Sequence, residues 1–83
     1  MLTEDRIKTV VLNILGRIAP EADLQNLDPA ERLRNQFDFD SVDFVNFAAE
    51  LQEQLKVVIP EQDYPLLATL EGCVGYLRSK TAA

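Results

Sequence analysis

The sequence lacks the residues from which many small enzymes build an active site. Its 83 residues include no histidine, no tryptophan and a single cysteine, Cys73. Without histidine there is no Ser-His or Cys-His pair for nucleophilic catalysis, and no histidine-based metal site. One cysteine cannot close an intramolecular disulfide, so the composition fits a reducing compartment. We therefore expect a protein that is not an enzyme, with Cys73 in a buried packing role.

Long apolar runs are also missing. No stretch approaches the roughly 20 apolar residues of a membrane-spanning helix, and the first residues lack the basic start and apolar run of a signal peptide. We expect a cytoplasmic monomer without membrane insertion. A chain of this length can bury one modest core, so residues 1–83 are predicted to form a single domain.

Acidic residues outnumber basic ones, and the excess is confined to one part of the chain. The formal net charge is −6. Residues 35–77 hold eight acidic residues and one basic residue, Lys56, whereas the rest of the chain holds six acidic and seven basic residues. Nucleic acid is not an expected partner, because binding it requires positive charge. Basic protein surfaces are expected partners, since complementary fields speed encounter.

Apolar residues at helical spacing predict three main helices and one short helix, with no strand. The first helix begins after a Thr3 N-cap and ends before Pro20, the second spans 41–55, and the last runs from a Thr69 cap to about residue 79. A short helix is expected over 61–67, with Asp63 as its cap. The predicted fold class is therefore an all-α four-helix bundle. The predicted buried faces consist of Ile7, Val10, Val11, Ile14, Leu15 and Ile18 in the first helix, Phe44, Phe47, Ala48, Leu51 and Leu55 in the second, and Leu70, Cys73, Val74 and Leu77 in the last.

The connection between the first two helices, residues 19–40, is unusually long. It contains spaced apolar residues instead of a periodic stripe. Asp28-Pro29 is typical of an N-cap followed by a first-turn proline, so a short helical turn is predicted over Pro29–Arg34. A loop of this length in a small domain is usually functional or held down by its own apolar side chains.

The segment FDFDSVDF at residues 37–44 places a hydroxyl where the second helix is predicted to begin. In the simplest interpretation, Asp40 or Ser41 is an ordinary N-cap, since both residue types are preferred at that position. Such dipeptides are common, so the pair alone does not indicate a function.

A calcium-binding loop is a second interpretation, because acidic residues alternate at Asp38 and Asp40. The EF-hand pattern starting at Asp38 requires Asp or Asn, Gly and Glu at its later positions. The sequence has Val42, Asp43 and Ala49 there. The pattern fails, and no metal site is expected.

A third interpretation rests on resemblance to a family. The tripeptide Asp-Ser-Val at 40–42 resembles the Asp-Ser-Leu attachment motif of acyl carrier proteins. The motif opens the second helix of an all-α domain of fitting length. Residues 51–60 resemble the end of that family's second helix and the turn after it, and residues 69–70 resemble the start of its last helix. The resemblance covers essentially the whole chain and is strongest over 37–77.

The resemblance implies a cofactor, a site and partners. In this family a separate Mg²⁺-dependent phosphopantetheinyl transferase (holo-carrier synthase) moves 4′-phosphopantetheine from coenzyme A to the serine, here Ser41 between Asp40 and Val42. The arm then carries acyl groups as thioesters to acyl-transferring or acyl-modifying enzymes of a lipid, fatty-acid or secondary-metabolite pathway, which have basic docking surfaces. The implied partner-binding residues are Val42, Asp43, Asn46, Ala49, Glu50 and Glu53.

All four phenylalanines lie within residues 37–47. In the family, long acyl chains fold into the gap between helices. The rings therefore either line such a gap or fill it, and core filling is the more common role of a phenylalanine at helical spacing.

Several positions depart from the usual family pattern. Val42 replaces leucine, Asn46 stands where acids are frequent, Ala49 is smaller than the usual residue, and Phe39 stands where a small residue is usual. These departures favour a specialised stand-alone carrier over the general fatty-acid carrier. Two alternatives remain open, namely a peptidyl or aminoacyl carrier, and a cofactor-free acidic helical adaptor in which Ser41 is only a cap.

Overall fold

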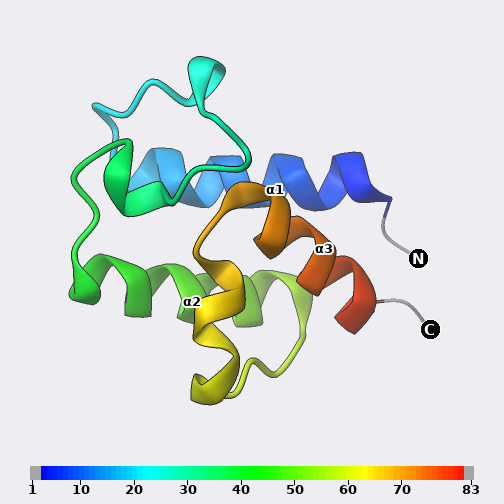
Figure 1. Cartoon of the computed structure of the whole chain (residues 1–83). Coiled ribbons are helices and arrows are strands. Elements are labelled where there is room, and N and C mark those ends of the chain that lie inside the picture. The colour runs from blue at the N-terminus through cyan, green and yellow to red at the C-terminus, as the bar shows by residue number, and fades with distance from the viewer. Residues whose placement is uncertain (1–2, 82–83) are drawn as a thin grey trace.

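The computed structural model describes residues 3–81, which fold into helices joined by short turns and one long connection (Figure 1). The elements in chain order are α1 (Glu4–Ile18), η1 (Leu24–Asn26), η2 (Leu33–Asn35), α2 (Ser41–Leu55), η3 (Glu61–Leu67) and α3 (Leu70–Thr81), where η denotes a 3₁₀ helix. Helix α1 packs against both α2 and α3, and α3 also contacts η3. Within residues 3–81 there is no β-strand, only an isolated bridge between Arg32 and Thr69. The prediction of an all-α fold with three main helices and one short helix is confirmed.

Helix α1 begins and ends as its sequence predicts. The Thr3 hydroxyl accepts a hydrogen bond from the backbone N–H of Arg6 at 3.2 Å, which satisfies one of the open donors of the first turn. The helix ends at Ile18; Ala19 is the C-cap residue, its N–H donates to the carbonyl oxygen of Leu15, and Pro20 follows. Ile7, Val11, Ile14 and Leu15 are fully buried, as expected, whereas Val10 and Ile18 are only half-buried at the edge of the core.

Helix α2 spans the residues predicted for it, because its caps and its apolar spacing agree. Phe47, Ala48, Leu51 and Leu55 are buried against the rest of the core, and Phe44 is half-buried. The helix ends at Leu55, and the C-cap residue Lys56 adopts the left-handed conformation common just after helix C-termini.

The long connection does not follow its prediction. A helical turn over 29–34 is wrong, because Asp28 closes a tighter turn in which its Oδ1 accepts from the N–H of Ala30 at 2.9 Å. Arg32 is extended, with φ −61° and ψ 135°, and forms the bridge to Thr69. This pairing with a residue far away in sequence replaces the local helix, and the chain turns into η2 only afterwards.

Element η3 has the predicted bounds but not the predicted cap. Asp63 lies inside η3, where its N–H donates to the carbonyl oxygen of Pro60 at 2.9 Å and its carboxylate accepts from the hydroxyl of Tyr76 at 2.7 Å. Pro60 is the N-cap residue and makes no side-chain cap. Pro65 lies in the second half of the element, where it has no N–H to donate, and its carbonyl oxygen accepts from the N–H of Ala68 at 3.3 Å.

Helix α3 starts at the predicted cap, where Thr69 Oγ1 accepts from the N–H of Gly72 at 2.9 Å. A Cβ atom at Gly72 would lie 2.9 Å from the carbonyl oxygen of Leu66 in η3, so this glycine allows the two elements to approach closely. Cys73 is buried as predicted, and burial raises the pKa of its thiol to about 12.

One hydrophobic cluster of buried residues joins every described helix except η1. It includes residues of α1, α2, α3, η2 and η3, and also Phe39 and Ile59 from the connections. No helix within the described range is both long and apolar enough to cross a membrane.

Candidate functional site

The start of α2 is held by a reciprocal pair of hydrogen bonds. Asp40 Oδ1 accepts from the backbone N–H of Asp43 at 2.9 Å, and Asp43 Oδ2 accepts from the N–H of Asp40 at 3.4 Å. This arrangement is a capping box. It settles which residue is the cap, because Asp40 takes that role and Ser41 becomes the first residue of the helix.

The Ser41 side chain is therefore not needed to cap the helix. The side chain is exposed, and among residues 3–81 its hydroxyl makes no hydrogen bond. The backbone N–H groups of Ser41 and Val42 have no acceptor within the same described range, as expected for the first positions of a helix. An exposed hydroxyl beside two open N–H donors, at the positive end of a helix dipole, suits the attachment of a phosphodiester. The residues present thus fit a phosphopantetheine group.

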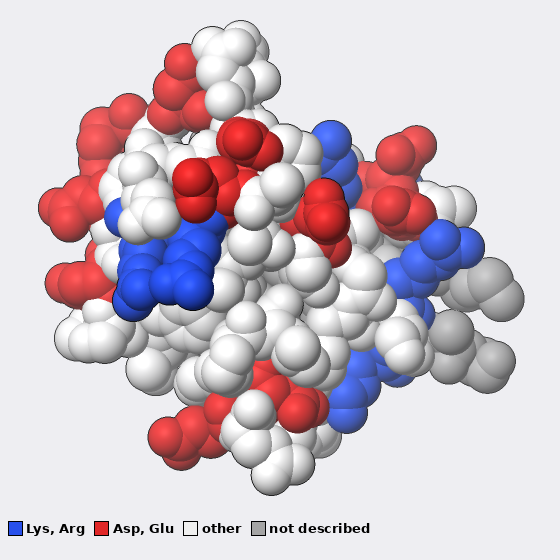
Figure 2. All heavy atoms as spheres, viewed as in Figure 1, with Lys and Arg blue, Asp and Glu red and all other residues white. Residues whose placement is uncertain are grey.

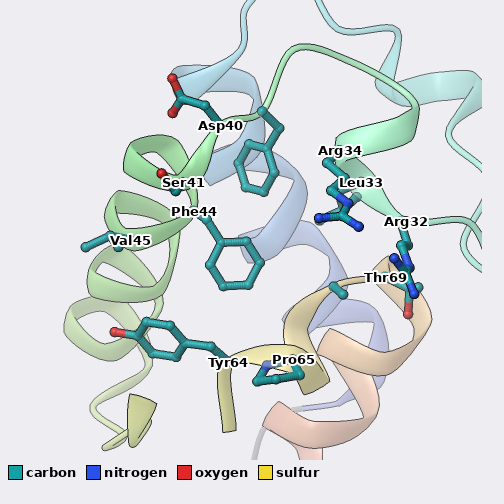
Figure 3. A pocket seen from close by; sticks show the side chains of 12 residues that line it. Arg32, Leu33, Arg34, Asp40, Ser41, Phe44, Val45, Tyr64, Pro65 and Thr69 are labelled. Carbon is teal, nitrogen blue, oxygen red and sulfur yellow. The ribbon is translucent and has the colours of Figure 1, made fainter. Parts of the chain in front are cut away.

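A groove of about 880 Å³ opens next to Ser41, between η2, the start of α2 and η3 (Figure 3). One wall is aromatic. The ring centroids of Phe39 and Phe44 are 5.8 Å apart, and those of Phe44 and Tyr64 are also 5.8 Å apart. Such a volume and an apolar lining are typical of small-molecule sites in proteins.

The phenylalanines both fill the core and line this groove. Phe47 is fully buried and Phe39 is 7% exposed, so the expectation that these rings fill the interior holds for the two of them. Phe44 is half-buried with one side toward the groove, while Phe37 packs on Phe39 with a centroid separation of 5.3 Å.

The opposite side of the groove contains residues that the sequence did not single out. Arg32 and Arg34 line it, although they lie before α2 in the chain, in and next to η2, and Tyr64 of the aromatic wall was not singled out either. No local pattern indicated them, because Leu33–Asn35 forms the 3₁₀ helix η2 and only the packing of η2 near α2 and η3 brings the arginines to the groove.

The six residues implied as a partner-binding surface do not have equal exposure. Asp43 is half-buried and occupied by the capping box. Glu50 is half-buried too, and its carboxylate accepts from Arg17 in α1 at 3.2 Å and from Gln54 at 3.2 Å. The charge of Glu50 is thus partly neutralised within the protein. Among the three acidic residues of the implied surface, Glu53 is the one whose carboxylate makes no hydrogen bond or ion pair within residues 3–81. The remaining members, Val42, Asn46 and Ala49, are exposed.

Comparison with family models identifies the kind of protein. A model described as "Phosphopantetheine attachment site" matches residues 5–77, a range that contains α2, η3, all of α1 but its first residue, and most of α3, as well as Ser41. Proteins of this kind carry their cofactor without catalysing a reaction, and they require a phosphopantetheinyl transferase and client enzymes. The chain belongs to the carrier-protein family that is defined by a phosphopantetheine attachment site.

Proposed function

We propose that this protein is an acyl carrier whose 4′-phosphopantetheine arm is attached to Ser41. The observation that carries the proposal is that capping and attachment fall to different residues at the start of α2. Asp40 caps the helix, and the exposed hydroxyl of Ser41 is left without a partner among residues 3–81. The other serine, Ser79, lies near the end of α3, where the helix dipole disfavours a phosphate.

Attachment of the arm at Ser41 requires only a few groups of this chain. When the arm is bound, its thiol supplies the thioester linkage to the cargo. The chain contributes the hydroxyl that becomes the phosphodiester oxygen, and the open N–H groups of Ser41 and Val42 that face the new negative charge. The Ser41 oxygen displaces adenosine 3′,5′-bisphosphate from coenzyme A, and the proton of Ser41 passes to a base of the transferase or to water.

The aromatic groove next to Ser41 supports an acyl cargo in particular. Phe39, Phe44 and Tyr64 offer apolar surface that a flexible arm attached at the rim can reach. Covering an apolar chain there removes it from water and is favourable by about 25 cal/mol per Å² of buried surface. Delivery to enzymes of a lipid or secondary-metabolite pathway, a cytoplasmic location and a monomeric state stay predictions.

Partner enzymes are expected to approach the exposed side of α2. Val42 is 65% exposed and Val45 is 52% exposed, so the helix presents apolar side chains next to acidic ones. Glu53 is the acidic residue of this surface with the most freedom to attract a basic partner, because Glu50 is paired with Arg17.

Mass spectrometry tests the attachment. The purified protein is incubated with coenzyme A, Mg²⁺ and a broad-specificity phosphopantetheinyl transferase. We expect a mass gain of one phosphopantetheine, which is absent in Ser41→Ala and retained in the matched control Ser79→Ala. A mass gain that persists in Ser41→Ala would move the site elsewhere. No gain with several transferases would favour the cofactor-free adaptor.

A further inference from the structure

Two arginines face the groove beside Ser41. Arg32 and Arg34 lie on the side opposite α2, across from the aromatic rings (Figure 3). Figure 2 shows a patch of basic side chains bordered by acidic and neutral ones on the left of the view. Neither arginine forms an ion pair within residues 3–81, in a protein whose net charge is −6.

The backbone that bears these arginines is fixed. Arg32 forms the bridge to Thr69, and the N–H of Leu33 donates to the carbonyl oxygen of Ala68 at 2.9 Å. The Leu33 side chain, only 1% exposed, anchors the segment in the core. The backbone under both side chains is therefore held in place, and both exposed arginines line the groove.

The acid nearest in sequence does not neutralise them. Glu31 Oε1 accepts from the backbone N–H of Arg32 at 2.8 Å and from the side-chain amide of Asn35 at 3.2 Å. Asp40 also borders the groove, but its carboxylate is bound to the N–H of Asp43 and points away from the rings in Figure 3. The groove thus combines an apolar wall with an excess of positive charge.

We propose that the cargo of this carrier is an acyl group whose far end is a carboxylate. This inference rests on the proposed attachment at Ser41. The arm folds back from the rim, the acyl chain lies against Phe39 and Phe44, and the terminal carboxylate is bound by Arg34 and Arg32. A guanidinium group presents paired N–H donors that match the two oxygens of a carboxylate.

The positive charges of Arg32 and Arg34 also distinguish between aminoacyl, neutral acyl and carboxylate-ended cargoes. An aminoacyl cargo has an ammonium group, which two unpaired guanidinium groups repel. A neutral acyl chain gains the apolar contact but leaves both arginines without an anion. The arm's own phosphodiester is the other source of an oxyanion near the groove, so the experiment has to separate it from the cargo.

The test uses the whole protein loaded on Ser41 with cargoes of equal chain length. Octanoyl, suberyl and amine-ended thioesters are transferred from the corresponding coenzyme A derivatives, and loading is confirmed by mass. Cleavage of each thioester by hydroxylamine is then followed, and each rate is divided by the rate for the same thioester on free pantetheine. We expect the suberyl thioester to be protected about tenfold more than the octanoyl thioester, the size of effect that a charge-assisted contact supplies.

A matched pair of variants assigns the effect to the groove. Arg32→Gln/Arg34→Gln should reduce suberyl protection to the octanoyl level. Arg6→Gln/Lys8→Gln, which removes two exposed charges from α1, should leave it unchanged. Thermal melting of each variant without cargo checks that it is folded.

Each result supports or overturns the proposal. Equal protection of suberyl and octanoyl thioesters overturns it, and greater protection of the amine-ended thioester would point to an aminoacyl carrier instead. If the arginine variants change the melting temperature of the arm-bearing protein without cargo and do not affect cargo protection, the guanidinium groups serve the phosphodiester, and the proposal fails. Failure to load Ser41 at all is seen earlier, by mass, and refutes the proposed function itself.

Discussion

The two glycines of α3 provide a matched test of the packing between α3 and η3. Gly75 is exposed, and a Cβ atom there would meet nothing within 4 Å. Gly75→Ala should therefore stabilise the protein by about 1 kcal/mol, the difference in helix propensity between the two residues. In a domain of this size that corresponds to a rise in melting temperature of about 4–8 °C.

The same substitution at Gly72 should have the opposite effect. A Cβ atom would lie 2.9 Å from both the Leu66 carbonyl oxygen and Thr69 Oγ1. Relieving these contacts requires η3 to move or the Thr69 cap to break, and such overpacking costs roughly 1–3 kcal/mol. The gain in helix propensity is smaller in the first turn than in the middle of the helix, so Gly72→Ala should be destabilising by about 1–2 kcal/mol.

Urea denaturation of the two variants measures the difference directly. We expect their midpoints to move in opposite directions from that of the unaltered protein, with similar slopes. If Gly72→Ala stabilises the protein as much as Gly75→Ala, the close approach of η3 to α3 is not a constraint and the reasoning is refuted. The result also bears on function, because η3 forms one side of the groove.

Three further predictions concern the site and its surroundings. Asp40→Ala should reduce the free energy of unfolding by about 1 kcal/mol in urea denaturation through loss of the α2 cap, and no loss would assign the cap elsewhere. The pKa of Tyr76 is raised from 10.0 to about 12, first by partial burial and then by the hydrogen bond to Asp63 and the negative charge of Asp63. The neutral hydroxyl is thus favoured in the folded state, and its contribution to stability is complete below pH 10 and lost as the pH rises toward 12. Ultraviolet titration of the two tyrosines should show one late transition that disappears in Tyr76→Phe, and its persistence would contradict the assignment. Finally, Glu53→Lys should slow arm transfer about fivefold at low salt, with less effect at high salt. Equal slowing by the control Glu21→Lys would remove the steering argument.

The sequence by itself determined the helices and the position of the serine. The bounds of α2, the Thr3 and Thr69 caps and the buried faces were all predicted, because capping and apolar periodicity act between residues a few positions apart. The composition and the motif likewise indicated a carrier, which the family match confirms.

The tertiary structure alone decided how distant segments meet. Arg32 bridges Thr69 instead of joining a helical turn, Asp63 accepts from Tyr76 instead of capping η3, and Glu50 pairs with Arg17 in another helix. Each of these contacts joins residues far apart in the chain, and local propensity contains no information about them. The groove with its two arginines exists for the same reason, since its walls come from η2, α2 and η3, and only packing around a shared core brings them together.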